Sequence, residues 1–168
     1  MVDWKYYPTN IKIPEHMLKI VEVFECHESK ISSDRYTLES NSVLMEITKS
    51  LEKNGFQVEL SKRKVDKIRV PVTYKERGEI DLAFDADAYH ADNKTVLEVE
   101  AGRAVTNYQF LKDLFQSCMM VDVEYFCVSV RKIYKNRNDY KKVVSFFDAL
   151  YASNRIQLPL KGILIIGY

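Results

Sequence analysis

The chain has 168 residues, 46% of them hydrophobic, and a formal net charge of +1. This length and composition suit one folded domain with a hydrophobic core, and they exclude an intrinsically disordered chain. The near-neutral charge neither requires nor excludes a nucleic-acid partner.

The cysteine content and the apolar runs indicate the environment of the protein. Three cysteines, an odd number without paired spacing, argue against a disulfide framework and favour a reducing, cytoplasmic location. No apolar run reaches the ~18 residues of a membrane span, so no membrane partner is expected. The sequence also lacks a glycine-rich phosphate-binding loop, which argues against a nucleotide cofactor.

The first 39 residues are expected to form an arm and a helix that precede the main core. Residues 1–12 are aromatic and irregular, and we interpret them as an arm packed on the domain, with a base-stacking arm as the alternative. Pro14 favours the start of a helix that continues to about His27, with apolar residues at helical spacing. We predict a single domain over 1–168, with its core at about 40–168.

The next segment predicts one helix and two strands. The serine and asparagine residues at 40–42 offer an N-cap for an apolar-striped helix, and Gly55 favours its end. A short strand is expected over 56–60. A second is expected over 68–74, where Pro71 indicates a sheet edge or a bulge.

Residues 79–103 contain two strand-like runs with acidic residues on one face of each. In the second run Glu98 and Glu100 alternate with apolar residues, so a strand directs both side chains to the same face. The first run has four acidic residues on one face: Glu79, Asp81, Asp85 and Asp87. If the runs pair as a hairpin, the carboxylates repel one another unless a cation lies among them, and Mg²⁺ prefers oxygen ligands. A solvated acidic face is the alternative interpretation.

The remaining pattern predicts alternating helices and strands. A helix is expected over 104–120, an apolar strand over 125–130, a helix capped by Asn138 or Asp139, and a final strand over 162–168. An antiparallel meander followed by βαβ crossovers gives an α/β fold with a mixed β-sheet flanked by α-helices.

This order of elements, with an Asp and then Glu-x-Glu on the meander, resembles the PD-(D/E)xK nuclease superfamily. Asp81 matches the motif Asp, and Glu98-Val99-Glu100 matches the Glu-x-Lys element in a Glu-x-Glu form similar to that of BamHI-type restriction enzymes. The resemblance covers about residues 40–130 and implies a restriction-endonuclease-like fold. It also implies an endonuclease that hydrolyses DNA with Mg²⁺, or Mn²⁺ as a substitute, and that works as a homodimer.

The resemblance also assigns roles to these residues. It implies that Asp81, Glu98 and the carbonyl group of Val99 hold the metal ion. Glu100 is then expected to position or deprotonate the attacking water, or to hold a second metal ion. Asp81, Glu98 and Glu100 are therefore the predicted catalytic residues.

The register of the hairpin leaves the first metal ligand open. A tight turn at 92–93 would place Asp87, rather than Asp81, opposite Glu98. Asp85 lies on the same face of the run and is a further alternative. The 17-residue spacing between Asp81 and Glu98 suits the family, and a longer loop or a bulge would restore their pairing.

Basic residues near the acidic runs are candidates for contacts with DNA phosphates. The candidates are Lys62, Arg63, Lys64 and Arg103. Glu100 stands where most members of the superfamily have Lys. A catalytically inactive adaptor that binds DNA or protein on the same fold is therefore the alternative function.

Overall fold

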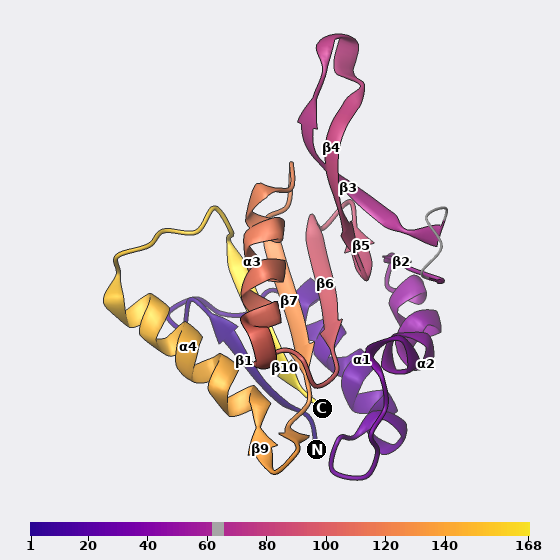
Figure 1. Ribbon diagram of the computed structural model, residues 1–168, viewed down its shortest axis with the longest axis vertical. Coiled ribbons are helices and arrows are strands. Elements are labelled where there is room, and N and C mark those ends of the chain that lie inside the picture. The colour runs from indigo at the N-terminus through magenta and orange to yellow at the C-terminus, as the bar shows by residue number, and fades with distance from the viewer. Residues whose placement is uncertain (62–65) are drawn as a thin grey trace.

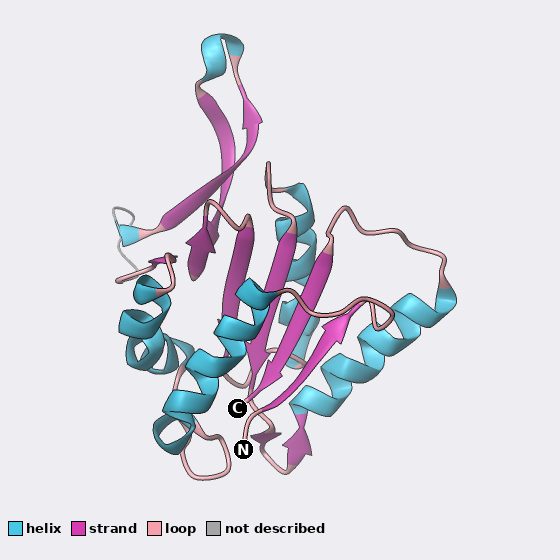
Figure 2. Cartoon of the chain, turned by 180° about the vertical axis from the view of Figure 1, so that it is seen from behind, coloured by secondary structure: helices cyan, strands magenta, loops and turns pink. Residues whose placement is uncertain are grey.

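The computed structural model describes residues 1–61 and 66–168, and it contains a mixed β-sheet with helices on both faces (Figure 1, Figure 2). The helices are α1 (Glu15–Ile31), α2 (Ser40–Lys53), α3 (Gln109–Met119) and α4 (Asp139–Ser153). The strands are β1 (Asp3–Tyr7), β2 (Gln57–Val58), β3 (Ile68–Tyr74), β4 (Ile80–Ala86), β5 (Ala88–His90), β6 (Thr95–Glu100), β7 (Tyr125–Val130), β8 (Ile133–Tyr134), β9 (Arg137–Asn138) and β10 (Gly162–Gly167). Short 3-10 turns occur at η2 (Glu76–Gly78) and η3 (Thr106–Tyr108).

The main sheet has six strands in the order β1-β10-β7-β6-β5-β2. The central strands β10, β7 and β6 are parallel, whereas β1, β5 and β2 each pair antiparallel with their neighbours. This is the mixed, helix-flanked sheet that the sequence predicts. The prediction of an irregular arm is wrong for residues 3–7, because their backbone pairs with β10 from Asp3↔Gly167 to Tyr7↔Ile163.

Alternation along β6 divides the core into two layers. Leu97 and Val99 belong to the cluster packed against α1 and α2, whereas Val96 belongs to the cluster packed against α3 and α4. Because side chains alternate along a strand, Glu98 and Glu100 lie on the same face as Val96 and are directed toward α3. Two acidic side chains therefore lie on a face of the sheet that a helix covers.

The acidic run of the sequence is divided at Asp87. Strand β4 pairs with β3 in a separate two-stranded ribbon, while β5 pairs with β6 in the main sheet. Figure 1 shows this β3–β4 ribbon projecting away from the rest of the molecule. Its register shifts between Pro71 and Tyr74, which agrees with the bulge expected at Pro71.

Helix ends differ from the predicted ones by a few residues. Helix α3 begins at Gln109 rather than near residue 104, because Asn107 and Tyr108 have φ angles of 66° and 52°, which no α-helix contains. Asn138 caps α4 as predicted, and its side chain accepts a hydrogen bond of 2.8 Å from the backbone of the first turn. Helix α2 starts at Ser40.

Two further findings concern the described residues. Within 1–61 and 66–168, no helix has the length and apolar character needed to cross a membrane. All three cysteines are free thiols, as their number and spacing predict.

Candidate active site

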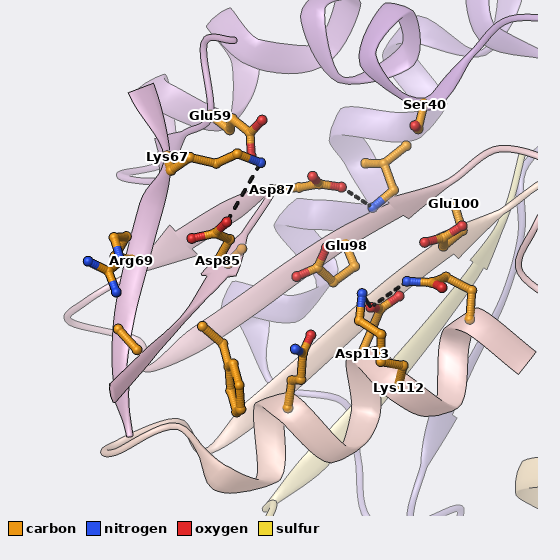
Figure 3. A pocket seen from close by; sticks show the side chains of 16 residues that line it. Ser40, Glu59, Lys67, Arg69, Asp85, Asp87, Glu98, Glu100, Lys112 and Asp113 are labelled. Atoms are coloured by element: carbon orange, nitrogen blue, oxygen red, sulfur yellow. Dashed lines mark hydrogen bonds and ion pairs between the residues drawn. The ribbon is translucent and has the colours of Figure 1, made fainter. Parts of the chain in front are cut away.

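A cavity of about 680 Å³ lies between α3, β6 and the base of the β3–β4 ribbon (Figure 3). Charged and amide side chains dominate its lining. The polar lining residues are Ser40, Glu59, Lys67, Arg69, Asp85, Asp87, Glu98, Glu100, Gln109, Lys112, Asp113 and Gln116. A concave site with converging ionisable groups is the usual place for binding or catalysis.

Strand β6 contributes Glu98 and Glu100 to the floor of this cavity. Burial raises the pKa of Glu98 well above its usual value, and the negative charges of Asp87 and Asp113 raise it further. Burial also raises the pKa of Glu100 to about 8, with Asp113 as the next cause. Two carboxyl groups predicted from the alternation of the sequence therefore share one cavity.

Asp87 joins them at the bend between β4 and β5. Its Oδ2 accepts a hydrogen bond of 2.8 Å from the backbone N–H of Val99 on β6. The register pairs Ala88 with Leu97, so the next position along brings Asp87 beside Glu98. Burial raises the pKa of Asp87 to about 6, although the Val99 hydrogen bond lowers it.

Asp81 lies elsewhere. Its carboxylate is in the projecting part of the β3–β4 ribbon, 53% exposed, 3.8 Å from Lys75 Nζ and 3.5 Å from Thr73 Oγ1. It does not line the cavity. Asp87 is six positions farther along extended strand, which is about 20 Å of chain. The structure therefore does not bring Asp81 together with Glu98 and Glu100, because β4 leaves the sheet with β3 instead of pairing with β6.

The other predicted residues take different positions. Val99 lines the cavity, and its N–H is bonded to Asp87. Arg103 is exposed in the loop after β6 and is not among the cavity-lining residues. Lys62, Arg63 and Lys64 lie outside the described residues.

Helix α3 supplies a wall of the cavity that was not predicted from the sequence. Gln109, Lys112, Asp113 and Gln116 all line the cavity, and they recur at intervals of three and four residues. That spacing places them on one face of the helix. In the sequence these residues form a polar stripe beside the apolar stripe of the helix. A polar stripe ordinarily faces water, so it does not by itself indicate a cavity wall.

The wall of the cavity opposite α3 contains two ion pairs of Lys67. Lys67 Nζ lies 3.1 Å from Glu59 Oε2 and 3.8 Å from Asp85 Oδ2. Both acids are thus at least partly neutralised by one ammonium group. In the described part of the chain no ion pair is found for Glu98 or Glu100 on β6, whereas Asp113 on α3 has Lys112 Nζ at 3.5 Å.

The donor set suits a hard divalent cation. Four carboxyl groups with raised pKa line one cavity: Asp87, Glu98, Glu100 and Asp113. Asp113 Oδ2 is buried without a hydrogen-bond partner in the described part of the chain. As arranged, no three His, Cys, Asp or Glu side chains of 1–61 and 66–168 converge closely enough to surround an ion. Mg²⁺ commonly binds through one or two carboxylates and keeps its other ligands as water, so these residues fit it.

The fold has counterparts among solved structures. The crystal structure of free BglII is similar over 99% of this chain and 78% of its own, with 12% identity and a TM-score of 0.52. The crystal structure of the restriction endonuclease BglII complexed with a DNA 16-mer covers 99% of this chain and 77% of its own, with 15% identity and a TM-score of 0.57. No family profile and no characterised protein sequence matches the chain. The chain therefore has the restriction-endonuclease-like fold that its resemblance to the PD-(D/E)xK superfamily implies.

Proposed function

We propose that this protein is a Mg²⁺-dependent deoxyribonuclease that hydrolyses phosphodiester bonds at the cavity between α3 and β6. One observation supports this most directly. Asp87, Glu98 and Glu100 share one cavity, on the fold of a restriction endonuclease that has been crystallised with DNA. The pairing of Ala88 with Leu97 and the hydrogen bond from Val99 N–H to Asp87 support Asp87, rather than Asp81, as the partner of this Glu-x-Glu element.

Each acid has a distinct role in the proposal. Asp87 and Glu98 hold the metal ion, together with the carbonyl group of Val99. The bound ion supplies polarisation of the phosphoryl oxygen and a lowered pKa of water. Glu100 would accept a proton from the attacking water, and with its pKa raised to about 8 the ionised form that can do so predominates above about pH 8. Mn²⁺ is expected to substitute for Mg²⁺.

Two lysines can interact with the substrate phosphate. Lys112 extends from α3, with its side chain 56% exposed, and Lys67 stands on the opposite wall. They bring positive charge to a site whose Glu-x-Glu motif has none. Arg103, Lys62, Arg63 and Lys64 are also proposed to contact DNA. A homodimer with two such cavities is part of the proposal.

Substitution of single carboxylates tests the assignment. Supercoiled plasmid is incubated with the purified protein in Mg²⁺, Mn²⁺ or EDTA. Asp87→Asn and Glu98→Gln are each expected to slow nicking at least about 100-fold, because a catalytic metal contributes several kcal/mol to the transition state. Asp81→Asn is the matched control and is expected to cut at the wild-type rate.

The outcomes separate the competing assignments. If Asp81→Asn abolishes cutting and Asp87→Asn does not, the proposed ligand set is wrong. If the wild-type protein retains plasmid in a gel-shift assay but never cuts it with either metal, the DNA-binding adaptor replaces the nuclease. Glu100 in place of the usual Lys is the feature that favours this second function.

A further inference from the structure

A strongly basic segment includes the β8–β9 hairpin. Strand β8 pairs with β9 across a two-residue turn, in which Lys135 and Asn136 have φ angles of 46° and 61°. A type I′ turn, the usual connection of such tight hairpins, requires positive φ at both positions. Residues 131–138 form what we call the basic hairpin. Together with the first turn of α4 they contain six basic residues: Arg131, Lys132, Lys135, Arg137, Lys141 and Lys142.

Three cations of the basic hairpin surround one aromatic ring. Arg131 Cζ and Lys135 Nζ each lie 5.3 Å from the ring centroid of Tyr134. Arg137 Cζ lies 5.8 Å from the same centroid. Each cation is attracted to the ring, but the three positive charges repel one another. None of the three forms an ion pair within residues 1–61 and 66–168. An anion bound among them would reduce this repulsion.

The acid that follows the hairpin, Asp139, does not pair with these cations. It is fully buried at the start of α4, and neither of its carboxyl oxygens has a hydrogen-bond partner in the described part of the chain. Burial raises the pKa of Asp139, although the charges of Arg137, Lys142 and Arg131 lower it. Asp139 is therefore a weak counter-ion, and the charge on the outer side of the hairpin stays available to an anion from solvent.

Contacts with the rest of the protein fix the geometry of this charge cluster. The Arg131 guanidinium donates a hydrogen bond to a backbone carbonyl between α1 and α2, and Arg137 donates one of 3.2 Å to Thr106 Oγ1. A Cβ added to Gly102 would lie 2.5 Å from the Tyr134 ring, so this ring packs directly on the backbone there. Arg137 Nε is buried and has no hydrogen-bond partner among the described residues. The cluster is therefore preorganised, and it retains an unused donor.

The basic hairpin begins beside the acidic cavity. The parallel register of β6 and β7 pairs Glu100 with Val130, and Arg131 is the next residue. Gly102 and Thr106, which contact the hairpin, lie in the segment that connects Glu100 to α3. Figure 1 shows β9 at the end of the molecule opposite to the β3–β4 ribbon. A DNA strand bound at Glu100 therefore has this cluster of positive charge beside it.

We infer that the basic hairpin binds the phosphate backbone of the DNA that is cut at the cavity, through Lys135 and Arg137. This rests on the proposed function, which places DNA at Glu100. Lys135 is exposed at the turn, and Arg137, held by Thr106, is partly exposed. An ammonium and a guanidinium group are the side chains that bind phosphate oxygens most strongly. A free phosphate ion is the other source of the same chemistry.

The salt dependence of DNA binding tests the inference without any cutting. Full-length protein in EDTA is titrated into a fluorescent DNA duplex at several NaCl concentrations, and binding is followed by anisotropy. Each phosphate contact contributes about 0.9 to the slope of log K against log salt concentration, so a double variant, Lys135→Asn with Arg137→Gln, is expected to lower the slope by about 1.8. Its affinity at about 0.1 M NaCl is expected to fall at least about 10-fold. With Mg²⁺, plasmid nicking by this variant is expected to show a raised KM and an unchanged kcat, because the contact is the same in the ground state and the transition state.

Two further variants control the measurement. Lys49→Ala with Lys53→Ala removes two exposed lysines from α2, which packs on the other face of the sheet, and is expected to keep the wild-type slope. Lys135→Asn alone is expected to lower the slope by about 0.9, even if the double variant does not fold. Asn readily adopts the positive φ of this turn position, so this change removes the charge without straining the backbone. Thermal melting verifies the fold of each variant.

Three outcomes would overturn the assignment of the hairpin. The first is a wild-type slope and affinity in the hairpin variants, and the second is an equal loss in the α2 variant, which would indicate a general charge effect. The third is a free-phosphate site: inorganic phosphate, at constant ionic strength, raises the melting temperature of the wild type but not of Lys135→Asn, while both bind DNA equally. The nuclease proposal fails separately. Hairpin-dependent DNA binding without plasmid cutting sinks the activity and leaves the contact intact, whereas cutting with unchanged binding and KM in the hairpin variants sinks only the contact.

Discussion

Asp87→Asn is expected to stabilise the metal-free protein while abolishing its activity. The raised pKa of Asp87, from 3.8 to about 6, means that its charged form is less favourable in the folded state than in the unfolded state. Between these pH values the folded protein binds more protons than the unfolded chain. Wild-type stability therefore falls as the pH rises from about 4 to about 6, and the loss persists at higher pH.

The size of the effect follows from the pKa shift. A shift of about two pKa units corresponds to at most about 3 kcal/mol at pH 8, since one unit is worth about 1.4 kcal/mol. Relaxation of the site reduces this, and we expect a gain of about 1–2 kcal/mol. Asn retains an oxygen that accepts the Val99 N–H, so the substitution removes the charge without removing the hydrogen bond.

Urea unfolding and thermal melting in EDTA measure the prediction. At pH 8 the variant is expected to melt about 2–8 °C above the wild type, and near pH 4 the two are expected to converge. Added Mg²⁺ or Mn²⁺ is expected to raise the melting temperature of the wild type more than that of Asp87→Asn, because ligand binding stabilises only the state that binds it. Asp85→Asn, at a more exposed carboxylate, is expected to change stability by less than about 0.5 kcal/mol. A variant less stable than the wild type at pH 8 would refute the reasoning from buried charge.

Three other predictions concern stability. Because the pKa of Glu100 is raised from 4.5 to about 8, the unfolding free energy of the metal-free wild type is expected to keep falling up to about pH 8, and Glu100→Gln is expected to flatten this slope in urea titrations. Gly102→Ala is expected to cost more than about 1 kcal/mol in the same assay, because φ is +92° and the new Cβ would lie 2.5 Å from the ring of Tyr134. Phe147→Ala, at a fully buried ring, is expected to cost about 3–5 kcal/mol by thermal or urea unfolding.

Matched variants control these measurements. Gly78→Ala has a similar φ of +79° but no atom within 4 Å of the new Cβ, so it should cost less than Gly102→Ala. Phe115→Ala removes a ring that is 54% exposed and should cost much less than Phe147→Ala. Equal costs within either pair would show that the contact with Tyr134, or the burial of Phe147, does not determine stability.

Local patterns predict the elements well and the pairing of strands less well. The alternation of residues 97–100 correctly places Glu98 and Glu100 on one face. The alternation of 79–88 is equally regular, yet the chain bends at Asp87 and β4 leaves the sheet with β3. Nothing local marks that bend, because it depends on which strands pair. The preference for Asp81 rests on a spacing that suits the superfamily, whereas the alternative of a tight turn at 92–93 agrees with the observed register, which brings Asp87 beside Glu98.

Long-range contacts explain two further differences between sequence and structure. Residues 3–7 form a strand because β10, at the other end of the chain, provides its hydrogen-bond partners. Asp113 lies on a polar helical face that would ordinarily be exposed, but α3 packs this face toward β6. Burial of a polar stripe depends on what lies opposite, and a single sequence does not show it.

Asp87 connects the β3–β4 ribbon directly to the cavity. The residue is the last link between β4, which reaches outward with β3, and β5, which is fixed in the sheet. A tilt of the projecting ribbon would rotate the backbone at this link and shift the carboxylate relative to Glu98. A molecule that binds the outer end of the ribbon would therefore change the distance between the carboxyl groups of Asp87 and Glu98.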